Sequence, residues 1–157
     1  MNYKLIIGLI LFVLSLLIGY EYVKKYTRKR VFFTEFNNFN NDLMSEISYL
    51  KNTIPEIIKK NFNIKSDFYK GLYMFFINAE EKVVLPNYLT DKESNLYINY
   101  LKTIGRGNSV TTSQYLNSIK NTIALYLNES IKKEEKNKPL CIKLSIIIGL
   151  IAIIAIL

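Results

Sequence analysis

The side chains that most often carry enzyme chemistry are scarce in this sequence of 157 residues. It contains no histidine, which is the commonest general base and a frequent metal ligand. Its single cysteine, Cys141, adjoins the C-terminal apolar run and cannot form a disulfide within the chain. The composition therefore indicates a protein that is not an enzyme, and we expect no catalytic residue, no metal ligand and no cofactor-binding residue.

Three short motifs contain residue types that could do chemistry, but their context does not suit it. Gly105-Arg106-Gly107 superficially resembles a phosphate loop, yet it follows a predicted helix and lacks the Gly-Lys-Ser/Thr ending. A helix end followed by a turn explains these glycines better. Glu80-Glu81 and Glu134-Glu135 are adjacent carboxylates, which point in different directions on a helix and so do not form an acid/base pair.

The elements around these motifs are set by an uncharged apolar run at each end of the chain. One run extends from Leu5 to Tyr20 and the other from Leu144 to Leu157. The first is shorter than the about 20 residues of a full membrane span. Tyr3 and Tyr22 can extend it as interfacial residues, and Lys4 can reach the headgroups. Both runs therefore predict membrane-spanning helices.

A cleaved signal peptide is the alternative for the first run. Such a peptide has a basic start, an apolar core and a small-residue cleavage site. Here the basic start is weak, and Gly19-Tyr20-Glu21 is a poor cleavage site. No cysteine lies near the run, which excludes a lipoprotein anchor. We therefore favour a retained anchor over a cleaved signal peptide.

The formal charge of +8 is concentrated beside the apolar runs. Basic and acidic residues balance from Val31 to Ile131. A nucleic-acid-binding protein would spread its positive charge over a folded face, whereas flanking charge suits anionic lipid headgroups and cytoplasmic loops. We therefore expect a membrane partner and no nucleic acid, with the central domain cytoplasmic and both termini across the membrane. The membrane-flanking basic residues are Lys24, Lys25, Arg28, Lys29, Arg30, Lys132, Lys133, Lys136, Lys138 and Lys143.

The apolar spacing predicts helices throughout the chain. No glycine or proline occurs between Tyr20 and Ile54, so the first membrane helix should continue unbroken along its apolar stripe. That stripe recurs every three or four residues. Its members are Phe32, Phe36, Phe39, Leu43, Ile47 and Leu50.

Shorter helices should follow before a second long helix. The starts expected for them are Pro55, Ser66-Asp67 and the capping box from Thr90 to Glu93, while the second long helix should begin near Thr111. Pro139 should break or kink that last helix. The expected fold is all-α, a helical bundle of about five helices with N- and C-terminal transmembrane helices. The expected boundaries are 1–23 for the first membrane helix, 24–138 for the cytoplasmic domain and 139–157 for the second membrane helix.

Several aromatic residues fall off the apolar stripes and are candidates for exposed contact with a partner. They are Phe33, Tyr69, Tyr73 and Tyr88. The turn of Gly105, Arg106 and Gly107, at the far tip of the bundle, is a second candidate contact region.

Four motifs, taken in order, resemble the stage III sporulation protein AB family of endospore-forming bacteria. The first is a glycine-aromatic-glutamate boundary with a basic exit. The match spans nearly the whole chain. The four motifs, in chain order, are Gly19-Tyr20-Glu21 with the basic residues to Arg30, Glu46-Ile47-Ser48-Tyr49 with Ile54-Pro55-Glu56, Gly107 with Gln114, and the run Leu144 to Gly149.

The chain departs from the family pattern at three places. Asn52-Thr53 stands where the family usually has Thr-Pro, Val110 where an aspartate precedes the last cytoplasmic helix, and Ser145 where a glycine is usual. Ser109 or Thr111 could cap that helix instead.

The resemblance implies a structural membrane component of the channel-like complex between mother cell and forespore, on the mother-cell side in the outer forespore membrane. It also implies similarity to the inner-membrane platform proteins of type II secretion. Expected partners are other proteins of that complex, including its cytoplasmic ATPase, with Gln114 among the candidate contacts. Two alternatives remain: a generic type II secretion or pilus platform protein, and an autonomous lipid-binding or membrane-scaffolding protein. No small-molecule substrate is expected.

Overall fold

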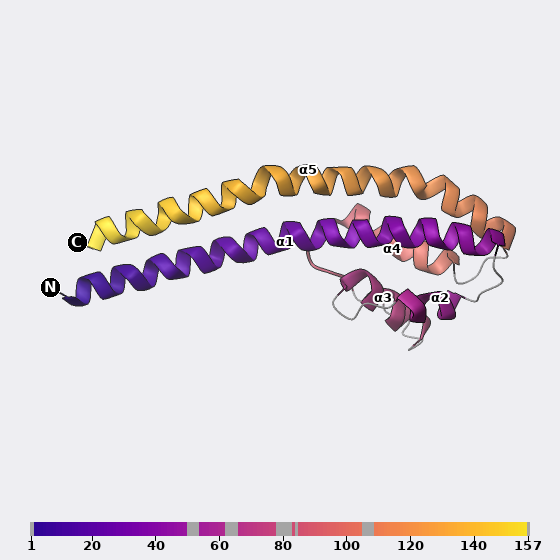
Figure 1. The fold of residues 1–157 in the computed structure, drawn as a ribbon, viewed down its shortest axis with the longest axis horizontal. Coiled ribbons are helices and arrows are strands. Elements are labelled where there is room, and N and C mark those ends of the chain that lie inside the picture. The colour runs from indigo at the N-terminus through magenta and orange to yellow at the C-terminus, as the bar shows by residue number, and fades with distance from the viewer. Residues whose placement is uncertain are drawn as a thin grey trace. The chain divides into compact units, whose positions relative to one another are not determined.

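The computed structural model describes residues 2–49, 54–61, 66–77, 83, 85–104 and 109–156. Within these ranges every regular element is an α-helix, which confirms the all-α fold with long apolar helices at both ends (Figure 1). The helices are α1 (Asn2–Tyr49), α2 (Ile54–Asn61), α3 (Asp67–Phe76), α4 (Asp91–Ile104) and α5 (Ser109–Ile156).

The chain forms two compact units. The hairpin unit consists of residues 1–28 and 130–157, and the core unit consists of residues 29–129. Both long helices contribute to both units, because α1 and α5 are each continuous over 48 residues. The division between the units therefore lies nearer the middle of the chain than the expected limits of 24–138.

The continuity of α1 confirms the prediction drawn from its lack of glycine and proline after Tyr20. Pro139 was expected to break or kink α5. A break was wrong, because α5 passes through this residue without interruption, and a kink stays a prediction. A proline inside a helix leaves the carbonyl four residues earlier, here that of Glu135, without its helical partner. Glu135 and Pro139 are both exposed, so water or a headgroup can satisfy that carbonyl.

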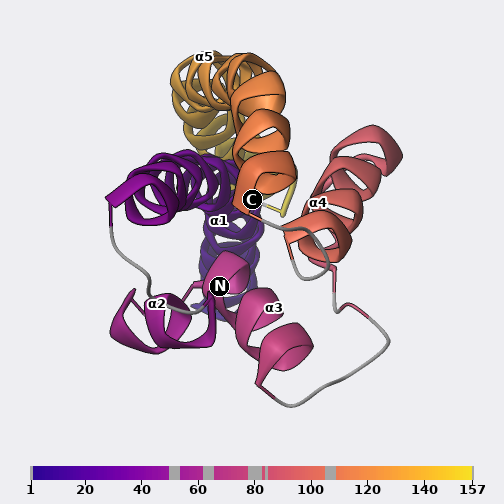
Figure 2. The same cartoon turned by 90° about the vertical axis from the view of Figure 1, so that its right-hand side faces the viewer.

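Aromatic packing against α1 forms the centre of the core unit. Phe32, Phe36 and Phe39 are all buried, as the apolar stripe predicts. The Phe36 ring lies 4.7 Å from that of Tyr100 on α4 and 5.3 Å from that of Phe68 on α3, measured between ring centroids. Within this unit, α5 lies on one side of α1 and the α2–α3 pair on the other (Figure 2).

The expectation that the off-stripe aromatic residues are exposed was wrong for Phe33, Tyr69 and Tyr88, which are buried. Phe33 faces Tyr126 of α5 at 5.6 Å, because helices surround α1 on more than one side. Tyr69 packs on Phe39, and Tyr88 donates a hydrogen bond of 2.7 Å to Asp67. These side chains therefore belong to the core, and substituting them would test folding rather than partner binding.

Two of the predicted helix N-termini, at Ser66 and Thr90, carry capping contacts. The Ser66 hydroxyl accepts a hydrogen bond from the Tyr69 amide at 3.3 Å and donates one to Glu35 of α1. At the start of α4, the Thr90 amide donates to the Glu93 carboxylate at 2.7 Å, and the Glu93 amide donates to the Thr90 hydroxyl at 3.4 Å. These contacts confirm the predicted capping box.

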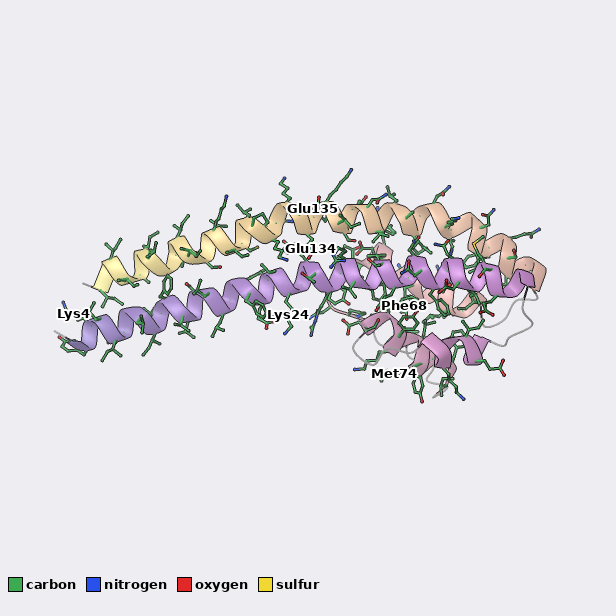
Figure 3. The ribbon with its side chains drawn as sticks, in the orientation of Figure 1. Lys4, Lys24, Phe68, Met74, Glu134 and Glu135 are labelled. Atoms are coloured by element: carbon green, nitrogen blue, oxygen red, sulfur yellow. The ribbon has the colours of Figure 1, made fainter. Side chains whose placement is uncertain are left out.

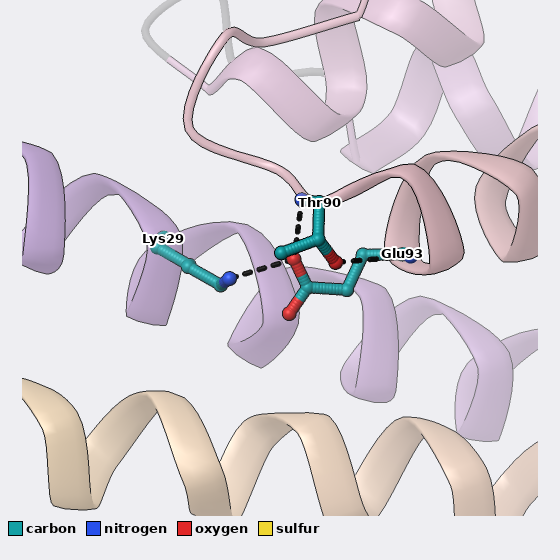
Figure 4. Close-up of polar contacts among 3 residues, drawn as sticks. All are labelled: Lys29, Thr90 and Glu93. Atoms are coloured by element: carbon teal, nitrogen blue, oxygen red, sulfur yellow. Dashed lines mark hydrogen bonds and ion pairs between the residues drawn. The ribbon is translucent and has the colours of Figure 1, made fainter.

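An ion pair joins this capping box to α1. The Lys29 ammonium lies 2.6 Å from the same Glu93 oxygen that accepts the Thr90 amide (Figure 4). The Lys29 side chain is 13% exposed and that of Glu93 is 4% exposed, so water screens the pair poorly. Lys29, expected to flank the membrane, thus has its charge paired within the core unit, and its place beside the membrane stays a prediction.

We expect Lys29→Met to lower the free energy of unfolding by about 3 kcal/mol, because removing one partner of a buried pair leaves an uncompensated charge. Denaturant unfolding of the full-length chain in mild detergent, followed by circular dichroism, measures this loss. The exposed Lys59→Met is the matched control. Adding Glu93→Gln to Lys29→Met should recover most of the stability, because glutamine still accepts the Thr90 amide. A double variant no more stable than Lys29→Met would contradict this account.

Two tyrosines of α4 lie fully inside the core. The Tyr97 hydroxyl donates a hydrogen bond of 2.8 Å to the Phe68 carbonyl on α3. Gly71 makes room for it, since a Cβ at that position would lie 2.5 Å from the Tyr97 hydroxyl. Burial raises the pKa of Tyr97 and of Tyr100, and burial with the nearby carboxylates of Glu35 and Asp42 raises the pKa of Tyr69 to about 12.

These raised pKa values predict alkaline unfolding. The folded state holds the phenol protons more tightly than the unfolded state does, whose reference pKa is 10.0. Their contribution to stability is therefore complete below that value and is lost as the pH rises through the folded pKa values. In an ultraviolet titration of tyrosinate, part of the signal should appear only as helical circular dichroism is lost. Tyr97→Phe should reduce that late part, and a titration that is complete before the helices unfold would contradict the prediction.

Candidate functional site

The apolar ends of α1 and α5 are long enough and apolar enough to cross a membrane. Few of their side chains are buried, and Ile154, for example, is 74% exposed. A core helix of a water-soluble protein would bury such residues, and so large an exposed apolar surface indicates contact with lipid or protein. Length, composition and exposure thus suggest a membrane protein.

Small residues bring the two helices of the hairpin unit into close contact. A Cβ on Gly19 would overlap the Ser145 hydroxyl and lie 2.7 Å from the Ser145 Cβ. A Cβ on Gly149 would lie 2.5 Å from the Phe12 ring and 2.6 Å from the Ser15 hydroxyl. Small residues at helix interfaces allow close backbone approach, which drives association in lipid, where apolar burial cannot.

Two serine hydroxyls add polar contacts to this interface. The Ser15 hydroxyl lies 2.8 Å from the Phe12 carbonyl and 2.9 Å from the Ser145 carbonyl across the helix pair. The Ser145 hydroxyl donates to the Cys141 carbonyl at 2.7 Å. Both hydroxyls are thus satisfied by backbone oxygens, as polar groups in hydrocarbon must be.

A second contact joins α1 and α5 at the polar end of the hairpin unit. The Thr27 hydroxyl donates to the Glu134 carboxylate at 2.8 Å, and Glu134 is buried while Glu135 is exposed (Figure 3). Together with the contact of Gly19 with Ser145, this pairing shows that the two helices run antiparallel. Glu134 and Glu135 thus point in different directions, as expected for adjacent residues on a helix.

The antiparallel pairing brings the two basic clusters to the same end of the hairpin unit. Lys25 and Arg28 of α1 are exposed there, and Lys24 lies 3.3 Å from Glu21. Arg30, partly buried, belongs to the core unit. The exposed basic residues of α5 in the hairpin unit are Lys132, Lys133, Lys136, Lys138 and Lys143.

An apolar groove runs along one side of the same helix pair. Its volume is about 310 Å³, and its lining includes Ile18, Tyr22, Leu144 and Ile148. Cys141 also lines it, without a basic side chain among the lining residues. The described residues contain no group of histidine, cysteine, aspartate and glutamate side chains that could hold a metal ion. The groove therefore suits an apolar chain.

The structure describes only some of the residues that were expected to contact a partner. Gln114 is exposed on α5, Tyr73 is partly buried on α3, and Tyr69 is buried. Gly105, Arg106 and Gly107 lie outside the described residues. The structure thus leaves Gln114 as the exposed member of this set.

The small-residue interface was not anticipated, although the sequence contains its signal. Gly8, Ser15 and Gly19 recur at helical spacing in the first apolar run, as do Cys141, Ser145 and Gly149 near the second. Such spacing is typical of closely packed membrane helices. The Lys29–Glu93 pair had no comparable signal, because its partners are far apart in sequence.

Comparison with known proteins identifies no relative. No family model, no curated protein and no solved structure matches the chain.

We expect Gly19→Ala to destabilise the hairpin unit by about 1–3 kcal/mol, because the added methyl must displace Ser145. Gly8→Ala is the matched control, since its Cβ would lie 3.5 Å from Ile153, an ordinary contact. Unfolding in mixed micelles of increasing denaturing-detergent content measures both. Ser145→Gly should restore most of the stability lost in Gly19→Ala. Equal effects of the two alanine variants would argue against close packing at Gly19.

Proposed function

We propose that this chain is a non-catalytic membrane-anchored assembly protein that holds a small helical domain at a bilayer surface. The observation that carries the proposal is the hairpin unit. Its two helices pack through Gly19, Ser145 and Gly149 while their large apolar side chains face outward. Such a pair suits a bilayer, because internal packing and backbone hydrogen bonding are complete without water.

The basic ends support an orientation for this anchor. Exposed lysines of both helices lie at the same end of the hairpin unit, and cytoplasmic flanks are enriched in lysine and arginine. The proposed topology therefore keeps residues 29–129 in the cytoplasm and places both termini across the membrane. Anionic headgroups are the lipid partners that this charge favours.

The assembly itself is proposed from the sequence resemblance. Motifs similar to those of the stage III sporulation protein AB family suggest a secretion-like complex between mother cell and forespore, with a cytoplasmic ATPase among its members. The scaffold role agrees with a core unit whose buried interior is filled mainly by aromatic and aliphatic side chains.

Cysteine accessibility in intact cells tests the topology. In a Cys141→Ser background, single cysteines replace the exposed residues Asn38 on α1 and Asn95 on α4. Both should be protected from a membrane-impermeant thiol reagent until the cells are permeabilised. Labelling of both without permeabilisation would reverse the orientation.

Purification from membranes of sporulating cells tests the assembly role. In mild detergent the full-length chain should retain a cytoplasmic ATPase together with other small membrane proteins. A chain that resists alkaline carbonate extraction yet co-purifies with no other protein would leave the membrane anchor standing and reject the assembly role. Saturable nucleotide binding by the purified chain alone would reject a non-catalytic scaffold.

A further inference from the structure

One exposed face of α5 within the core unit carries no charge. We call it the amide face; its residues are Gln114, Asn117, Ser118, Asn121, Leu125 and Asn128, all exposed. Lys120 is the one exposed charged residue of α5 between 111 and 128. It lies about 60° around the helix from Asn117, and so borders this face, but about 100° from Asn121 near the centre of the face.

The exposed positions elsewhere in the described part of the core unit differ in character. Many of them are charged: Asp42, Glu56, Lys59, Lys70, Asp91, Lys92 and Lys102. Leu125 is 55% exposed, whereas Val31, the other exposed large hydrophobic residue of this unit, is 36% exposed. Depletion of charge around an exposed apolar residue is typical of the centre of a protein interface.

The spacing along the amide face matches that of a coiled coil. Gln114, Ser118, Asn121, Leu125 and Asn128 follow one another at steps of four, three, four and three residues. This repeat averages 3.5 residues per turn, which keeps one seam facing a partner helix. A coiled-coil seam that is polar at most positions binds weakly. Such a pairing therefore needs two helices that are already held close together, as in one membrane.

We propose that the amide face pairs in parallel with the same face of a second copy of this chain. The inference rests on the proposed membrane anchor, since two copies inserted in one membrane with the same orientation run α5 in the same direction. The helix is unbroken from the amide face into the apolar segment. Confinement in the membrane raises the effective concentration of the second copy.

Parallel pairing explains why the face is free of charge. Each residue meets its own counterpart, so any lysine or glutamate would meet a like charge, which opposes association. Asparagine and glutamine both donate and accept hydrogen bonds, and each can therefore pair with an identical side chain. An asparagine in such a seam also fixes the register of the two helices. A partner of different sequence would tolerate charge on this face, because its own residues could complement it.

Disulfide crosslinking in proteoliposomes tests the pairing with the full-length chain. In a Cys141→Ser background, Asn121→Cys lies on the seam and Lys120→Cys is the matched control one residue away. Under mild oxidation, the disulfide-linked dimer should be about tenfold more abundant for Asn121→Cys, because only seam positions bring the two Cβ atoms within bonding range. Adding Leu125→Asp should reduce that dimer about tenfold, since the two carboxylates would oppose each other. Adding Lys120→Asp should leave it unchanged.

The other outcomes overturn the proposal in distinguishable ways. Equal crosslinking at the two positions, or none at either, rejects the paired face. A crosslink from Asn121→Cys to a different protein in native membranes assigns the face to another partner. Release of the chain by alkaline carbonate rejects the membrane anchor and, with it, the parallel pairing. Retention in the membrane without crosslinking rejects only the pairing of copies. Circular dichroism of each variant confirms that α5 remains helical.

Discussion

The close approach of two helices at Gly19 and Ser145 is the constraint on which the hairpin unit depends. Lipid removes the hydrophobic incentive for apolar helices to associate, so van der Waals contact and a few hydrogen bonds must suffice. Side chains no larger than serine at the contact permit that approach, and the hydroxyls of Ser15 and Ser145 bond to backbone carbonyls. The same pairing fixes the antiparallel register and thereby gathers the lysines of both helices at one end.

The core unit is organised by a different interaction. The Phe32, Phe36 and Phe39 rings attract apolar partners from several directions, but apolar burial alone does not specify which turn of α4 lies against α1. The Glu93 carboxylate does so, because it accepts both the Thr90 amide and the Lys29 ammonium. A helix cap and an ion pair that share one buried oxygen position the start of α4 relative to α1.

Local sequence features predicted most of the fold, while tertiary contacts decided the rest. The continuity of α1 and the caps at Ser66 and Thr90 were predictable, because each depends on neighbouring residues. Pro139 does not interrupt α5, because an exposed helix can leave one carbonyl to solvent. Tyr69 was misjudged because a helical stripe does not reveal how many neighbours surround a helix. The ion pair of Lys29 could not be predicted, because its partner, Glu93, is distant in sequence.

The distribution of charge connects the two units. Exposed lysines crowd the polar end of the hairpin unit, where headgroups can neutralise them, while exposed acidic and basic residues both occur on the core unit. Against this mixed surface, the absence of charge from the amide face of α5 is informative. Solubility would favour lysine or glutamate at such exposed positions, as on α2 and α4. Two parallel copies exclude them from the amide face, because identical charges would meet there. Membrane orientation therefore constrains which residues this face can carry outside the bilayer.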